Sequence, residues 1–232
     1  MKSEANQVDQ TSREKLMKSA EHLFAERGYD GVSVRDIAND AGVNSALVGY
    51  YFGGKEGLLA EVYTQRCGLL RDERAQLLAE YSAGGKTPSL EEVLEAFITP
   101  SLESARNGEG RRSLPHIRSI LAAENSSLLE KLVAENFDES SKIFVKALGK
   151  CLPHLTHEDV LWRFHFLLGT IYYTATGPHR IKALSRGRCD PSDPAATKEE
   201  LIPFLVAGFT APSAAKGNKR RGRGRGNGTV KS

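Results

Sequence analysis

The 232-residue sequence predicts an all-α fold, and two observations support that prediction. Apolar residues recur at spacings of three and four through most of the chain, which is the period of an amphipathic helix. The apolar–polar alternation that marks a strand is absent, and the sequence contains no internal repeats. A chain that is 40% hydrophobic at this length can bury a substantial core, and it suits one small domain followed by one larger domain.

The most informative stretch is residues 33–59, which we interpret as two short helices joined by a tight turn and followed by a third helix. Ser33 precedes the first helical run, 34–41, and can accept a hydrogen bond from a free N–H group of its first turn. Gly42 ends that run where a left-handed residue is needed, and glycine adopts this conformation without steric cost. The next helix is expected at 45–51. This layout predicts a helix-turn-helix, which places one helix in the major groove of DNA.

A further helix is predicted upstream, from residue 12 to Gly28, with an apolar face formed by Leu16, Ala20, Leu23 and Phe24. The polar residues 1–11 are expected to be disordered, and they show no signal-peptide pattern. No apolar run is long enough to span a membrane. We therefore expect a cytoplasmic protein whose first helices form a compact unit over residues 12–54.

The residues of this unit resemble a known family. A helix is followed in order by GYDGVSVRDIA, AGVN, YYF and KEGLL, and the pattern covers residues 12–60 nearly without gaps. It is similar to the DNA-binding domain of the tetracycline-repressor (TetR) family of transcriptional regulators. The resemblance implies a repressor that binds a palindromic operator in double-stranded DNA as a homodimer and is released by a small-molecule effector.

The resemblance also implies roles for single residues. Ser33 and Lys55 match positions that meet phosphates, and Tyr51 matches a position that contacts the DNA backbone. Tyr50 and Tyr51 could instead be surface aromatics, and Lys55 a solvated lysine. The expected DNA-contacting set is Ser33, Arg35, Asn44, Ser45, Ala46, Leu47, Tyr50, Tyr51 and Lys55.

Two positions depart from the usual reading surface. Gly49 stands where many members of the family carry a tyrosine that contacts DNA, so one usual contact is missing. Glycine also lowers helix propensity by roughly 1 kcal/mol relative to alanine. Leu47 cannot hydrogen-bond a base edge, although it could meet a thymine methyl group. We expect specificity to come partly from DNA shape and backbone contacts.

Beyond residue 54 the pattern is helical up to a basic tail. Ser89 and Glu92 form a capping box, and Thr156 and Thr197 are expected to cap the last two long helices. Helices are expected near 55–80, 90–108, 116–121, 128–151, 156–176, 181–184 and 197–209. The predicted domains are a disordered segment 1–11, a DNA-binding domain 12–54, a connecting helix 55–80, an effector-binding and dimerisation domain 81–210 and a disordered tail 211–232.

The segment from Trp162 to Thr174 is similar to a subgroup of the family that includes regulators of fatty-acid degradation. By that resemblance, the helices at 156–176 and 197–209 pack against their symmetry mates as a four-helix interface. A helix that is apolar nearly all round is buried on all sides, as an interface helix would be; the alternative is a core helix in a monomer. The expected dimerisation residues are Leu161, Leu168, Tyr172, Leu201 and Leu205.

The effector is expected to be small and apolar or acyl-type. Aromatic and aliphatic residues could surround an apolar cavity in the bundle, and a few polar residues could fix an acid head group. Each of the apolar residues could equally be ordinary core. The candidate set is Phe97, His116, Arg118, Leu121, Phe137, Phe144, Trp162, Arg163 and Phe166.

The competing class is a helical-bundle enzyme. A di-iron site needs Glu-x-x-His pairs, and none of the six histidines has a glutamate three residues before it. His157 and Glu158 are not followed by the second histidine of a zinc protease motif. Three scattered cysteines argue against a zinc site or a disulfide framework. We therefore expect no catalytic residues, no metal and no cofactor.

The tail at 211–232 contains seven lysines and arginines and no acidic residue, so the remainder of the chain is mildly acidic. Such a segment adds salt-sensitive, sequence-independent attraction to DNA, or it serves only solubility. An alternative function is therefore a nonspecific DNA-coating protein driven by this tail.

Overall fold

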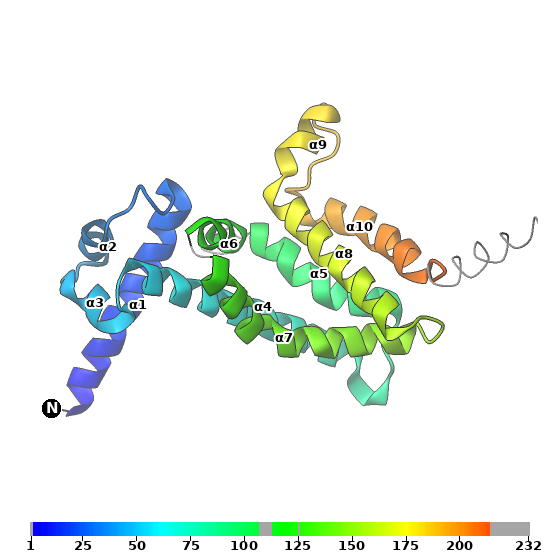
Figure 1. Cartoon of the computed structure of the whole chain (residues 1–232), viewed down its shortest axis with the longest axis horizontal. Coiled ribbons are helices and arrows are strands. Elements are labelled where there is room, and N and C mark those ends of the chain that lie inside the picture. The colour runs from blue at the N-terminus through cyan, green and yellow to red at the C-terminus, as the bar shows by residue number, and fades with distance from the viewer. Residues whose placement is uncertain (1, 107–112, 125, 214–232) are drawn as a thin grey trace, which may run out of the picture.

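The computed structural model describes residues 2–106, 113–124 and 126–213, and within these ranges it is helical without strands (Figure 1). The predicted all-α fold is confirmed. Residues 214–232, which hold the charges of the predicted basic tail, lie outside the described residues. In chain order the helices are α1 (Lys2–Arg27), α2 (Val34–Ala41), α3 (Ala46–Phe52), α4 (Lys55–Tyr81), a short 3-10 turn (Ala83–Gly85), α5 (Leu90–Arg106), α6 (Ser113–Glu124), α7 (Ser126–Cys151), α8 (His157–Thr176), α9 (Pro178–Leu184) and α10 (Pro194–Thr210).

The first helix is longer than the sequence predicts. Residues 1–11 are expected to be disordered, whereas α1 begins at Lys2. Extending a helix that already exists costs less than nucleating one, because each added residue gains a hydrogen bond. The Glu, Ala and Gln residues between Lys2 and Gln10 have good helix propensity, so the helix can propagate backwards into them.

The last helix also starts earlier than expected. Its N-cap is Asp193 rather than Thr197, and the Asp193 Oδ1 atom accepts hydrogen bonds from the N–H groups of Ala195 (3.0 Å) and Ala196 (3.3 Å). Aspartate is a strong N-cap, and the proline that follows it has a preset φ that suits the first helical position. Thr197 lies one turn inside the helix.

The buried apolar side chains form two clusters, which we call the head core and the distal core. The head core joins α1, α2, α3 and the first half of α4, and it also contains Ile117 and Leu121 of α6 and Leu132 of α7. The distal core joins the end of α4 to α5, α8, α10 and the second half of α7. The head core therefore extends beyond the DNA-binding domain predicted at 12–54, because α6 and the start of α7 complete it.

The arrangement of the helices follows from these cores. In Figure 1 α1, α2 and α3 lie at one end of the molecule, and α4 runs from them toward the opposite end, where α5, α7, α8 and α10 pack together. Two ion pairs join α1 to α4: Arg13 with Glu61 (2.5 Å), and Arg66 with the buried Glu21. The orientation of the three-helix head is thus fixed on α4.

A buried guanidinium fastens α4 to α5 in the distal core. Arg74 donates from Nε to the Phe97 carbonyl (2.9 Å) and from Nη2 to Ser101 Oγ (2.8 Å), and its guanidinium stacks on the Phe97 ring at 3.7 Å. Pro100 sits inside the same turn of α5, where it cannot donate a backbone hydrogen bond. Burial lowers the pKa of Arg74 to about 9. The side chain therefore ties α4 to the turn of α5 that contains Pro100.

Among the helices within the described ranges, none has the length and apolar character needed to cross a membrane.

Candidate nucleic-acid interface and effector site

The turn between α2 and α3 forms as its residues predict. Ser33 Oγ accepts from the Asp36 N–H group (3.1 Å), and the Ser33 N–H group donates to Asp36 Oδ2 (2.8 Å), which completes a capping box. The hydrogen bond from the Ser33 side chain holds the pKa of Asp36 below its usual value. Gly42 ends α2 with φ 66° and ψ 34°, in the left-handed conformation.

The recognition helix α3 is short, and it is held in place by contacts on its buried side. Asn44 Oδ1 accepts from the Ala46 N–H group (2.8 Å), whereas Ser45, the N-cap position, makes no capping bond with its side chain. Val48 is fully buried and pins α3 to the head core. The helix ends at Gly53, where φ is 71°.

The residues expected to contact DNA lie on or next to α2, α3 and the start of α4, and α2 and α3 lie at one end of the molecule (Figure 1). Tyr50 is 76% exposed and stands edge-on to Tyr51, with ring centroids 5.1 Å apart. Leu47 and Tyr51 are half-buried and pack against the head core, so each offers only part of its side chain to a ligand. The other expected residues on α2 and around the turn are exposed: Ser33, Arg35, Asn44, Ser45 and Ala46.

Lys55 has a partner that the sequence interpretation missed. Its Nζ atom lies 3.9 Å from the centroid of the Tyr29 ring. A cation at the first residue of α4 is disfavoured by the helix dipole, and the ring face offsets part of that cost. Tyr29 therefore holds the ammonium group beside the N-terminus of α4. The aromatic residue in the GYDG motif was the available signal for this contact.

Gly49 leaves open space on α3. A Cβ atom built at this position meets no other atom within 4 Å. The backbone of α3 at Gly49 therefore carries no side chain and adjoins open space, next to the exposed residue Tyr50. Neither a clash nor a special backbone angle requires glycine here.

The residues expected to line an effector cavity are not gathered around one cavity. Phe97 and Phe144 are buried in the distal core with ring centroids 4.9 Å apart, while Leu121 and Phe137 belong to the head core. Phe164, which was not among the candidates, fills the remaining side of the Phe97 ring at 5.2 Å. Close packing of these rings leaves the centre of the bundle filled.

The remaining candidates for the effector site also lie apart. Trp162 and Phe166 are exposed on the outside of α8. Arg163 donates to the backbone carbonyls of Phe209 and Ala211, so it fastens the end of α10 to α8. Arg118 is exposed, with its guanidinium 5.4 Å from the ring centroid of Tyr172. The side chain of His116 lies outside the described residues.

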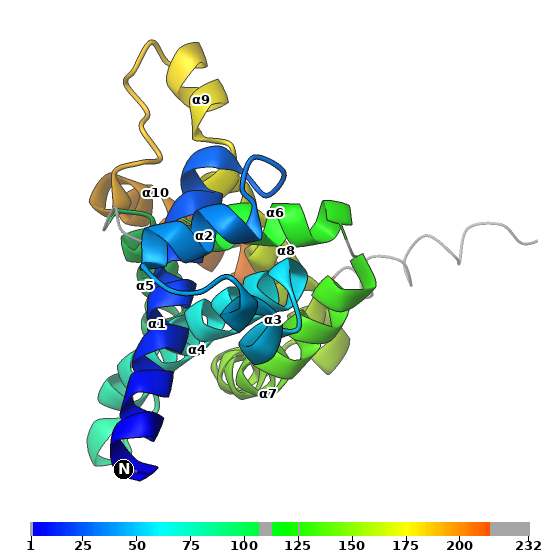
Figure 2. The same ribbon diagram turned by 90° about the vertical axis from the view of Figure 1, so that its left-hand side faces the viewer.

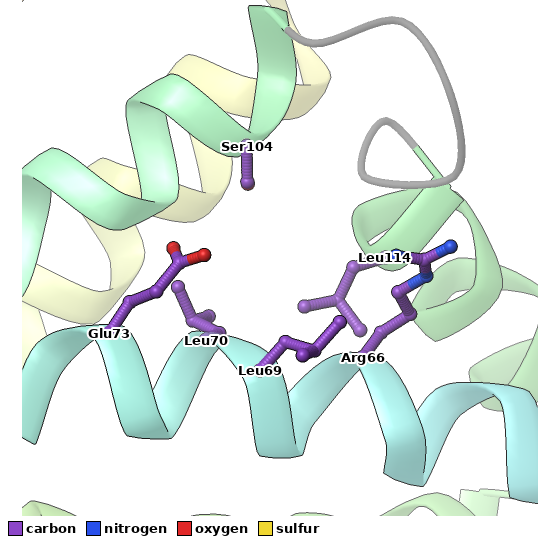
Figure 3. Close-up of a pocket in the computed structure, with 6 residues that line it drawn as sticks. All are labelled: Arg66, Leu69, Leu70, Glu73, Ser104 and Leu114. Atoms are coloured by element: carbon purple, nitrogen blue, oxygen red, sulfur yellow. The ribbon is translucent and has the colours of Figure 1, made fainter.

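Two hollows occur near these helices. The smaller, of about 20 Å³, lies between α4, α5 and α6 and holds about one water molecule (Figure 3). Arg66, Leu69, Leu70 and Glu73 of α4 point into it, facing Ser104 and Leu114. The larger, of about 410 Å³, is a groove between α7 and α8 lined by Asp138, Ser141, Lys142, Val145, Lys146, His157, Leu161 and Phe164.

The α7–α8 groove has an apolar floor and a charged rim. Val145 and Phe164 are buried and form its base. Lys142, Lys146 and His157 are exposed at its edges, and Lys142 also pairs with Glu139 at 2.5 Å. Sequence reasoning missed these residues, because the groove depends on which faces of two helices meet.

A broad apolar face is exposed on α8 and α10. Trp162, Phe166 and Tyr173 of α8 and Phe204 of α10 are each between 60% and 66% exposed. Leu161, Leu168 and Tyr172, expected at the dimer interface, are also exposed. Leu201 and Leu205, expected there too, are instead buried in the distal core of their own chain. The exposed side of α10 is the side that carries Phe204.

In residues 2–106, 113–124 and 126–213, no group of three or more His, Cys, Asp and Glu side chains is placed to hold a metal ion.

A helix-turn-helix carried on a helical bundle defines the class of DNA-binding transcriptional regulators. Residues 16–62 match the family model described as bacterial regulatory proteins of the tetR family, and residues 95–208 match the tetracyclin repressor-like C-terminal domain. The chain is 32% identical over 155 residues to the HTH-type transcriptional regulator BetI of Agrobacterium fabrum, which covers 59% of this chain and 74% of BetI. The protein belongs to the TetR family of transcriptional regulators, and the resemblance noted from the sequence is confirmed.

Other similarities are more local or concern the fold. The probable HTH-type transcriptional regulator YttP of Bacillus subtilis is 42% identical over 55 residues, which is 24% of this chain and only 27% of YttP. The crystal structure of the transcriptional regulator FadR from Bacillus subtilis in complex with stearoyl-CoA superposes with a TM-score of 0.64 at 19% identity, covering 84% of this chain and 97% of FadR. At that identity the likeness establishes a shared fold.

Proposed function

We propose that the protein binds a palindromic operator as a homodimer and represses transcription until a small apolar or acyl-type effector releases it. The observation that supports the proposal best is one chain that combines an exposed DNA-reading surface on α3 with a separate exposed apolar face on α8 and α10. Such a regulator acts in the cytoplasm, where it meets the chromosome.

The DNA-reading surface suits contacts with the backbone more than with base edges. Tyr50, Ser33 and Lys55 supply hydroxyl and ammonium groups for phosphates, whereas Gly49 and the half-buried Leu47 offer no hydrogen bond to a base. Each head therefore binds weakly and with modest selectivity. Two heads about 34–36 Å apart on one face of the duplex would supply the missing affinity and specificity.

The apolar face of α8 and α10 supports the homodimer. Burying one large apolar side chain is worth about 1.5–3 kcal/mol, and four aromatic side chains are exposed here. Gly169 lies between Phe166 and Tyr173 on α8, and a Cβ atom there meets nothing within 4 Å. The face therefore leaves room for another helix to approach closely. Pairing α8 and α10 with a second copy gives the four-helix interface that the family resemblance implies.

The α7–α8 groove supports the effector. Its volume lies within the range of about 300–1,000 Å³ usual for small-molecule sites. Its apolar base suits an aliphatic chain, and Lys142, Lys146 and His157 suit an acidic head group. FadR, which shares the fold, has been solved with stearoyl-CoA bound, which favours an acyl-type effector.

The helix α7 offers a route from the groove to the head. Lys142 and Lys146 line the groove, and Leu132 on the same helix lies in the head core. An effector that wedges α7 away from α8 would therefore displace Leu132 and disturb the packing of α6 and α1. Release of DNA requires that the effector bind this displaced state more tightly than the DNA-bound state.

Selection of bound genomic fragments followed by footprinting tests the proposal. A discrete protected site with two-fold symmetry is the expected result, and Tyr50→Ala should weaken protection there. Diffuse protection along every fragment would instead support a nonspecific DNA-coating protein. Sedimentation should give a dimer at micromolar concentration, and a monomer there would overturn the proposed assembly.

A further inference from the structure

One segment of the chain is poorly covered by the rest of the molecule. Residues 177–193, which we call the α9 arm, comprise α9 and the loop that leads to α10. In both views the arm projects beyond the other helices (Figures 1 and 2). Leu184 is 71% exposed and Ile181 is 41% exposed. Apolar side chains on a projecting helix are costly in water unless something covers them.

The arm is braced by its own interactions. Lys182 Nζ pairs with Asp190 Oδ2 at 2.6 Å, and the Cys189 N–H group donates to Ser185 Oγ at 2.9 Å. The Gly187 N–H group donates to the Lys182 carbonyl at 2.8 Å, with Gly187 in the left-handed region at φ 81°. These contacts within the arm help to give it a defined shape. A shape formed in advance loses less entropy when it binds a partner.

The exposed apolar surface continues from α8 onto the arm. Tyr172 and Tyr173 lie in the last turn and a half of α8, immediately before the arm begins, and both are exposed. Tyr173 belongs to the same exposed face as Trp162 and Phe166. Whatever covers that face is therefore positioned to cover the arm as well.

Charge indicates what the arm meets. Arg180, Arg186 and Arg188 are exposed on the arm, whereas its acidic residues are engaged within the chain: Asp190 with Lys182, and Asp193 as the N-cap of α10. An acidic pair, Glu199 and Glu200, is exposed on α10, and Glu200 lies one turn before Phe204 on the same side of the helix. The chain thus presents both a basic arm and an acidic surface next to its apolar face, as a self-complementary interface requires.

We propose that the α9 arm is a clasp that binds a second copy of this chain, with Ile181 and Leu184 covered by the partner and the arm's arginines directed at Glu199 and Glu200 of the partner subunit. The inference rests on the dimer put forward under the proposed function. The clasp adds contacts outside the four-helix interface, so removing it weakens the dimer without abolishing it.

The first test measures the dimer dissociation constant of Ile181→Glu/Leu184→Glu by sedimentation equilibrium. Both side chains are exposed, so the protomer should keep its fold, which circular dichroism checks. The dissociation constant should rise at least tenfold. Ile143→Glu is the matched control, because Ile143 is 57% exposed on α7, away from the α8–α10 face, and it should leave the constant unchanged. An unchanged constant in the arm variant would overturn the clasp.

The second test uses Cys189, which is exposed in the arm, while Cys67 is buried and Cys151 partly buried. A benzophenone maleimide is attached to Cys189 in a Cys151→Ser background, and isotopically light and heavy protein are mixed. The expected result is cross-links between light and heavy chains at the peptide that contains Glu199 and Glu200. If the dimer is intact but every cross-link lies within a single chain, the result would contradict the clasp and leave the dimer standing. A wild-type protein that is monomeric at micromolar concentration would contradict both the clasp and the dimer.

Discussion

The two ends of the molecule differ in where they place their aromatic side chains. In the head, Phe24 and Tyr63 are buried, and the exposed ring of Tyr50 stands edge-on to the half-buried ring of Tyr51. In the distal half, Trp162 and Phe166 are exposed side by side on α8, and other rings on α8 and α10 are exposed nearby. The head therefore buries its large apolar side chains within its own core, and its surface suits a polar, charged ligand. The distal half leaves an apolar face exposed, and we propose that a second copy of the chain covers it.

The largest effect should follow from breaking that apolar face. The double variant Trp162→Glu/Phe166→Glu places two charges where an apolar partner is expected, so the dimer should dissociate. Because two linked heads bind far more tightly than one, operator affinity should fall by roughly 100-fold or more in a gel-shift titration. The helical circular dichroism signal should not change. Retention of a dimer with full operator affinity would show that the partner docks elsewhere.

A smaller effect is expected inside the distal core. Arg74→Ala removes two charged hydrogen bonds and a stacked cation and leaves the Phe97 carbonyl without its donor, which should cost about 3 kcal/mol of unfolding free energy. Arg71→Ala is the control, because the Arg71 side chain is 42% exposed and its ion pair with Asp72 is at the surface, so its loss should cost less than about 0.5 kcal/mol. Urea unfolding at one fixed protein concentration measures both. Equal losses would mean that burial of Arg74 is unimportant.

Two of the capping boxes allow stability to be separated from DNA binding. Ser33→Ala in the head and Thr156→Ala at the start of α8 each remove one side-chain cap, so each should cost about 1 kcal/mol in unfolding free energy. Only Ser33→Ala should also weaken operator binding, because only Ser33 lies on the DNA-reading surface. If both variants bind the operator like the wild type, Ser33 makes no phosphate contact.

The smallest effect is expected at Gly49, where α3 has no side chain. Gly49→Ala should stabilise the head by up to roughly 1 kcal/mol, because alanine favours the helix and its Cβ atom has open space. Thermal unfolding measures the gain. Operator affinity should stay within about threefold of the wild type if the open space persists on DNA. A large loss of affinity would indicate that the DNA backbone packs against Gly49.

Much of the fold could be predicted because its signals are local. The capping boxes at Ser33, Ser89 and Thr156 join residues three positions apart, and the left-handed turn at Gly42 needs only one residue. These features formed as expected. The start of α10 is an exception: Thr197 was expected to cap it, whereas Asp193, four residues earlier and followed by a proline that suits the first helical position, is the N-cap.

The candidate sites were harder to predict because they depend on which helix faces meet. In α8, Phe164 is buried while Trp162 and Phe166 are exposed, although all three look alike in a helix that is apolar nearly all round. In α10, Leu201 is buried whereas Phe204 is exposed, and only the position of α5 decides between them. The reading surface of α3 was easier, because it could be carried over residue by residue from a motif.

The place of Leu132 in the head core has a consequence for biosynthesis. The three helices of the head emerge from the ribosome first, but their core is closed by side chains of α6 and α7, of which Leu132 is the last that is buried. At roughly 5–20 residues per second, several seconds separate the synthesis of α3 from that of Leu132. A nascent or prematurely terminated chain that lacks this residue has an incomplete head core. Under the proposed function, such incomplete products would not block operators as repressors that the effector cannot release.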